Sequence, residues 1–151
     1  MTEKHFVDTN VLIYAFDGGA GEKHERSAQL LEDLWNRRCG CLSIQVLQEF
    51  YVNAAKKLKM TSGEAFLHIQ RFAKWQVHRP DPEDILQAIR MQQAHSVSFW
   101  DAMVVRSAQQ LQCSILWSED LNAGQNYGGV LVRNPFLPAH RRRPKAPGQP
   151  R

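Results

Sequence analysis

The sequence lacks several features that would each assign it to a particular class of protein. It has three cysteines, Cys39, Cys41 and Cys113, an odd number without zinc-knuckle spacing or a disulfide framework. Its six histidines are scattered and include no pair at metal-binding spacing, which argues against a histidine-built zinc site. No apolar run approaches the ~20 residues that span a bilayer, and the first residues do not resemble a secretory signal. We therefore expect a cytoplasmic protein with reduced thiols and no membrane partner.

The charges are unevenly distributed along the 151 residues. Five of the 19 basic residues and none of the 15 acidic ones follow Pro138, so the preceding chain carries 14 basic and 15 acidic side chains. The last segment also contains three prolines and no apolar run. We expect residues 1–138 to form one domain and residues 139–151 to form a basic, disordered tail.

Strand-like runs alternate with helical patterns along the domain, which predicts an α/β fold with a parallel sheet covered by helices on both faces. Apolar spacing places Ile85, Leu86, Ala88 and Ile89 on the inner face of a helix that begins at Asp81. The predicted strands cover residues 5–8, 39–43, 75–77, 114–117 and 130–133, and the predicted helices cover residues 22–37 and 45–59, with others opening near residues 61, 81 and 98.

Four acidic residues could meet at one edge of this sheet. Asp8 and Asp120 follow predicted strands, whereas Glu49 and Asp101 lie early in predicted helices. Sites in open parallel sheets form beyond the carboxyl ends of the strands. Two carboxylates ~4 Å apart repel each other by about 4 kcal/mol at an effective dielectric constant of 20, so a cluster of acids favours a bound cation. Hard oxygen donors suit Mg²⁺ or Mn²⁺.

Each acid also has a structural interpretation without any metal. Asp101 could cap its helix in the run Ser98-x-x-Asp101, and Asp120 could be a turn residue. Helical periodicity places Glu49 nearly opposite the apolar stripe of its helix, which is typical of a solvated surface acid. Only Asp8, at the end of a predicted buried strand, is hard to assign to the surface.

Four segments, in order, resemble the motifs of a known family. The run FVDTNVLIYAF contains Asp8, LSIQVLQEF contains Glu49, SFWDAMVVRSA contains Asp101, and WSEDLNAGQNYGGVLVRNPF contains Asp120. This order resembles that of PIN domains, especially VapC-type ribonuclease toxins of toxin–antitoxin pairs. The resemblance covers residues 5–136 and implies a three-layer α/β/α sandwich around a parallel sheet.

The resemblance also implies a metal-dependent endoribonuclease that leaves a 5′-phosphate and a 3′-hydroxyl. It implies Mg²⁺ or Mn²⁺ held by Asp8, Asp101 and either Glu49 or Asp120, with all four acids as catalytic and metal-site residues. Its further implications are a cognate antitoxin, a homodimer and an RNA substrate, with transfer RNA the usual family target and ribosomal RNA an alternative.

Two polar residues are expected to support the metal ligands. Asn10 could orient Asp8 or a metal water through its amide, although a helix-capping role fits it equally well. Ser43 has the same two interpretations.

Other families fit less well. A haloacid-dehalogenase phosphatase needs a second aspartate where Asn10 stands. A receiver domain needs paired acids before its phosphorylated aspartate and a late lysine, and neither feature is found. The strongest alternative is a PIN-like domain that binds RNA or a protein without cutting.

Overall fold

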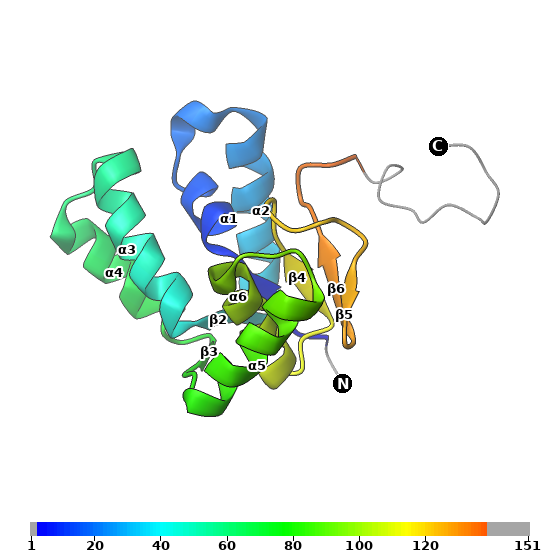
Figure 1. Ribbon diagram of the computed structural model, residues 1–151. Coiled ribbons are helices and arrows are strands. Elements are labelled where there is room, and N and C mark those ends of the chain that lie inside the picture. Colours follow the sequence, from blue (N-terminus) through cyan, green and yellow to red (C-terminus); the bar gives the residue numbers. More distant parts are fainter. Residues whose placement is uncertain (1–2, 139–151) are drawn as a thin grey trace.

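A six-stranded sheet forms the centre of the computed structural model, which describes residues 3–138 (Figure 1). The strand order is β3-β2-β1-β4-β6-β5. All neighbouring strands are parallel except β5 and β6. The expected basic tail, residues 139–151, lies outside the described residues. The strands are β1 (His5–Val7), β2 (Gly40–Ser43), β3 (Gln76–His78), β4 (Ile115–Trp117), β5 (Asn126–Tyr127) and β6 (Val130–Arg133).

Helices connect the parallel strands and cover the sheet. From β1 to β3 the chain moves across the sheet in one direction, and from β3 it returns to β4. Because such crossovers are right-handed, α1–α4 belong to one face and α5 and α6 to the other; Figure 1 shows α5 and α6 together in front of the strands. The predicted α/β/α sandwich is confirmed. The helices are α1 (Thr9–Tyr14), α2 (Glu22–Arg37), α3 (Ile44–Leu58), α4 (Ser62–Phe72), α5 (Pro82–Ala94) and α6 (Phe99–Gln110), with a 3₁₀ turn at Gly18–Ala20.

The direction of the chain reverses between β1 and β4, which lie side by side at the centre of the sheet. In parallel α/β sheets, the crevice at the carboxyl ends of two such strands is where ligands bind. Val7 pairs with Trp117 in the register of the two strands. Asp8 and Ser118 therefore leave the sheet side by side, and the backbone N–H of Asp8 donates to the carbonyl of Trp117 (3.0 Å).

The predicted inner face of α5 is wrong for three of its four residues. Ile85, Leu86 and Ile89 are exposed, whereas Ala88 is buried as predicted, together with the acid Asp84. Apolar periodicity could not identify this face, because one of the two side chains that α5 buries, that of Asp84, is charged. The carboxylate of Asp84 is stabilised by partners from other elements: Arg106 Nε (2.8 Å) and His78 Nε2 (3.3 Å).

The edge strand β5 was not predicted. It pairs antiparallel with β6 through a turn at Gly128 and Gly129, whose φ angles of 60° and 103° favour glycine. Its two residues are too few to produce an alternating pattern in the sequence.

Among residues 3–138, no helix has both the length and the apolar character needed to cross a membrane.

Candidate metal centre

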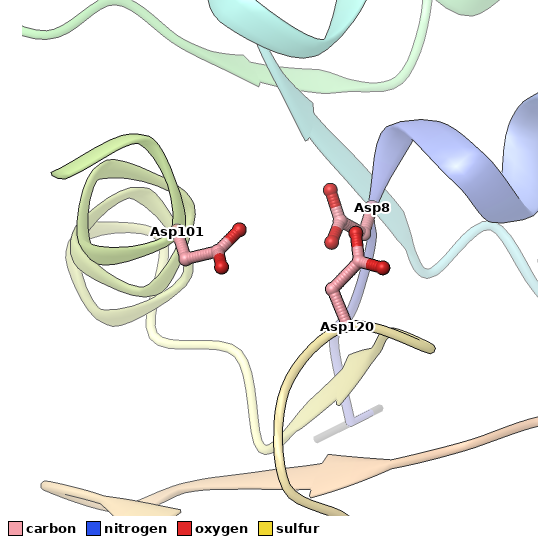
Figure 2. A group of neighbouring side chains, drawn as sticks. All are labelled: Asp8, Asp101 and Asp120. Atoms are coloured by element: carbon pink, nitrogen blue, oxygen red, sulfur yellow. The ribbon is translucent and has the colours of Figure 1, made fainter. Parts of the chain in front are cut away.

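Three of the four expected acids meet at the crevice between β1 and β4. One carboxylate oxygen from each of Asp8, Asp101 and Asp120 lies within 4.8 Å of the other two. Figure 2 shows that Asp8 comes from the end of β1, Asp101 from α6 and Asp120 from the loop after β4, and that Asp101 points toward the other two. Three chain segments that are distant in sequence thus supply one cluster of negative oxygen atoms.

Asp8 is the buried member of the cluster. Its Oδ1 accepts the backbone N–H of Thr9 (2.8 Å) and its Oδ2 accepts the hydroxyl of Ser118 (2.9 Å). Burial, and to a smaller extent the charges of Asp120 and Asp101, raise the pKa of Asp8 to about 6, even though its two hydrogen bonds act to lower it. The protein therefore holds this carboxylate in an environment that disfavours its charge unless a cation lies nearby.

Ser118 connects two members of the cluster. Its fully buried hydroxyl donates to Asp8 and accepts the backbone N–H groups of Asp120 (3.2 Å) and Leu121 (3.3 Å). One side chain thus fixes the orientation of Asp8 and the start of the loop that carries Asp120.

The Asp120 carboxylate is held from the side of α1. Asn10 donates through Nδ2 to Asp120 Oδ2 (2.9 Å). Of its two expected roles, the structure therefore places Asn10 beside a cluster acid, although the acid it contacts is Asp120 and not Asp8. The cap of α1 is Asp8 itself.

The neighbouring Glu119 points into a separate contact. It accepts the Tyr14 hydroxyl (3.0 Å) and pairs with the Lys23 ammonium group, which also lies over the rings of Tyr14 and Phe136. These contacts tie the loop that carries Asp120 to α1 and α2.

Asp101 lies in the first turn of α6, where its backbone N–H donates to the Ser98 hydroxyl (3.1 Å). The capping interaction uses the backbone of Asp101 and leaves its carboxylate facing the cluster (Figure 2). Burial raises the pKa of Asp101, and the negative charges of Asp120 and Glu49 raise it further.

Glu49 lies beside the cluster but not within the group of three. It is half-buried, and its Oε1 accepts the hydroxyl of Thr9 (2.7 Å). The periodicity argument for a solvated surface acid is therefore wrong. That argument counted only apolar contacts, whereas the inward position of Glu49 depends on a polar partner from α1.

Ser43 is fully buried at the start of α3, where its hydroxyl accepts the N–H of Val46 (3.2 Å). Its geometry is that of a helix cap. Two supporting hydroxyls, those of Thr9 and Ser118, were not predicted. Thr9 follows Asp8 directly, and Ser118 follows a strand. Because ligand sites in parallel sheets lie at the carboxyl ends of the strands, both residues could have been identified from the sequence.

The cluster fits a divalent ion of the hard, oxygen-binding type. Its donors are carboxylate oxygens from three segments, with no sulfur or imidazole donor among the clustered residues. Such donors suit Mg²⁺ or Mn²⁺ more than zinc. Burial and, to a smaller extent, mutual repulsion raise the pKa values of Asp8 and Asp101, and a doubly charged cation would offset both effects.

The sequence model of the PIN domain family matches residues 5–127. The chain belongs to the PIN domain family. All three clustered acids lie within the matched residues, and a search of curated proteins finds no match.

Solved structures share the fold of this PIN domain at low sequence identity. A toxin–antitoxin complex from Klebsiella pneumoniae is 19% identical with a TM-score of 0.67, covering 88% of this chain and 98% of its own. VapC20 from Mycobacterium tuberculosis, described as a toxin that cleaves the sarcin–ricin loop, is 18% identical with a TM-score of 0.62, covering 78% and 92%. DNA-bound VapBC from Salmonella typhimurium is 19% identical with a TM-score of 0.60, covering 89% and 99%. These likenesses establish the fold.

Proposed function

We propose that this PIN domain is a Mg²⁺- or Mn²⁺-dependent endoribonuclease. The observation that carries the proposal is the convergence of Asp8, Asp101 and Asp120 at the carboxyl ends of β1 and β4. A divalent ion held there would supply an activated water and stabilise the charge that develops on the phosphate. The family membership and the toxin structures that share the fold support RNA as the substrate class.

The chain's own residues have distinct roles in this proposal. Asp8 and Asp101 provide metal ligands from opposite sides of the cluster, and Asp120 or Glu49 completes the set directly or through water. Asn10 and Ser118 hold Asp120 and Asp8 in place by hydrogen bonds. Ser43 acts one step further away, by fixing the start of the helix that carries Glu49.

We also propose that the protein is the toxin of a toxin–antitoxin pair and forms a homodimer. Similar folds occur in complexes described as toxin–antitoxin from Klebsiella pneumoniae and as DNA-bound VapBC from Salmonella typhimurium. A cytoplasmic location follows from this role and is consistent with three cysteines that are all buried and unpaired. Transfer RNA is the proposed target, with ribosomal RNA as the competing substrate.

The test is cleavage of transfer RNA and ribosomal RNA by the purified chain with Mg²⁺, with Mn²⁺ and with EDTA. We expect metal-dependent cuts that leave 5′-phosphates, and we expect Asp8→Asn to abolish them. Equal cleavage by wild type and Asp8→Asn would defeat the catalytic assignment. RNA binding without cleavage under all conditions would favour the non-catalytic alternative.

A further inference from the structure

A large aromatic side chain lies exposed beside the acidic cluster. Trp100 immediately precedes Asp101 in the first turn of α6, and 61% of its surface is accessible. Burial of a tryptophan side chain is strongly favourable. An indole left in solvent at the edge of a candidate active site therefore suggests a contact made with something outside the chain.

One contact places the backbone of Trp100 beside α3. Its carbonyl accepts Gln45 Nε2 of α3 (3.3 Å), and its ring packs edge-on against Phe99 at 5.1 Å between centroids. Gln45 and Glu49 are one helical turn apart, so they lie on the same face of α3. Because Glu49 contacts Thr9 beside Asp8, this face of α3 runs along the cluster. Trp100 therefore stands at its rim, on the side where α3 meets α6.

The charge distribution favours a base over a phosphate as the group that contacts Trp100. Residues 1–138 carry 14 basic and 15 acidic side chains, and the acids of the cluster repel the RNA backbone wherever a cation does not neutralise them. Stacking on an aromatic ring requires no charge and accepts any unpaired base. Stacking on Trp100 would therefore hold an RNA chain that electrostatic attraction alone would bind only weakly.

We propose that Trp100 is a base-stacking residue that holds an unpaired nucleotide next to the phosphate to be cut. This inference rests on the proposed ribonuclease function and adds a preference for single-stranded or looped RNA. Paired bases are already stacked on their neighbours and cannot be splayed onto the indole without unpairing.

The test compares two labelled 12-mers of equal charge, an oligouridylate and a chain of abasic sugar phosphates. Binding is measured by fluorescence anisotropy in the full-length Asp8→Asn protein with Mg²⁺, so that cleavage does not interfere. The variants are Trp100→Ala and Trp100→Phe. Phe66→Ala is the matched control, since Phe66 is also 61% exposed but lies on α4, which supplies none of the clustered acids.

We expect Trp100→Ala to weaken oligouridylate binding by about 5- to 150-fold, the range for loss of one stacked base. Trp100→Phe should retain most of the affinity, and Phe66→Ala all of it. Binding of the abasic 12-mer should be weak and unchanged by Trp100→Ala. The dependence of affinity on salt should also be unchanged, because stacking involves no phosphate contact.

Three results would overturn the inference. Equal oligouridylate binding with and without the indole removes Trp100 from the RNA site while leaving the proposed function intact. A change in oligomeric state on Trp100→Ala, with RNA affinity unchanged, shows that a second copy of the chain covers the indole instead. No binding of either 12-mer by the wild-type protein with Mg²⁺ contradicts the proposed function, and the stacking role with it.

Discussion

Replacing Asp8 by asparagine should stabilise the metal-free protein while it removes activity. The folded-state pKa of Asp8 is about 6, compared with an ordinary value of 3.8. At about 1.4 kcal/mol per unit, its charge costs about 3 kcal/mol of folding free energy at neutral pH. Asparagine carries no charge, but it cannot reproduce the hydrogen bond from Ser118 in full, a loss of about 1 kcal/mol. The net gain for Asp8→Asn is about 2 kcal/mol.

The sign of this effect depends on pH. Because the pKa of Asp8 is raised in the folded state, the penalty is absent below about pH 4, where the carboxyl is protonated in both states. It develops as pH rises through 6 and is complete above it. The stabilisation by Asp8→Asn should therefore be present at pH 7.5 and disappear near pH 4.

The assay is urea unfolding in EDTA, followed by tryptophan fluorescence at both pH values. The control is Asp33→Asn, an exposed acid paired with Arg37 (3.0 Å), which should change stability by less than about 1 kcal/mol. Added Mg²⁺ should stabilise wild type and not Asp8→Asn, because an ion stabilises the fold that binds it and the substitution removes a proposed ligand of that ion. An Asp8→Asn protein no more stable than wild type at pH 7.5 would refute the reasoning.

Three other substitutions test the contacts around the site and the core. Ser118→Ala should lower the cleavage rate about 10- to 100-fold, because it frees the buried Asp8 carboxylate to move. Arg106→Met should cost about 3–5 kcal/mol in urea unfolding, since it leaves the Asp84 carboxylate buried without its guanidinium partner. Gly40→Ala should also destabilise the fold by about 1–3 kcal/mol, because the new methyl group would meet the Trp75 ring at 2.5 Å.

Each of these predictions has a control within the chain. Ser118→Thr keeps the hydroxyl and should retain cleavage. Loss of cleavage in this variant would show that the volume of the side chain, and not its hydrogen bond to Asp8, determines the rate. Arg37→Met removes an exposed helical ion pair and should cost less than about 1 kcal/mol. Gly63→Ala lies in α4 with no atom closer than 4.0 Å to the new group, and it should be neutral or stabilising. A loss at Gly63 as large as that at Gly40 would contradict the steric argument.

The sequence was sufficient for the fold because most of its elements follow apolar patterns. β1 and β2 are buried along their whole length, and the apolar stripe of α3 is buried at Leu47, Phe50 and Ala54 although Tyr51 is exposed. Asp8 and Asp120 were predictable for a related reason: each follows a central strand, and parallel strands end at the same edge. Asp101 required the family motif, because its position in a helical first turn also fits a simple cap.

The positions that were mispredicted involve polar contacts between distant segments. The Thr9 hydroxyl holds Glu49 inward, and Asp84 is buried because it pairs with the Arg106 guanidinium and contacts the His78 ring. Helical periodicity identifies the buried face of a helix from its apolar residues alone. It therefore predicts that acids such as these two are exposed to solvent. The contact from Asn10 to Asp120 depends on the path of the loop after β4, which no local pattern encodes.

The central claim is that Asp8, Asp101 and Asp120 form one divalent-cation site. Crystals grown with Mn²⁺ test it directly, through the anomalous scattering of the ion. The account predicts a peak about 2 Å from a carboxylate oxygen of Asp8 and of at least one of the other two acids. Diffraction from such crystals with no anomalous peak among these three carboxylates would contradict it.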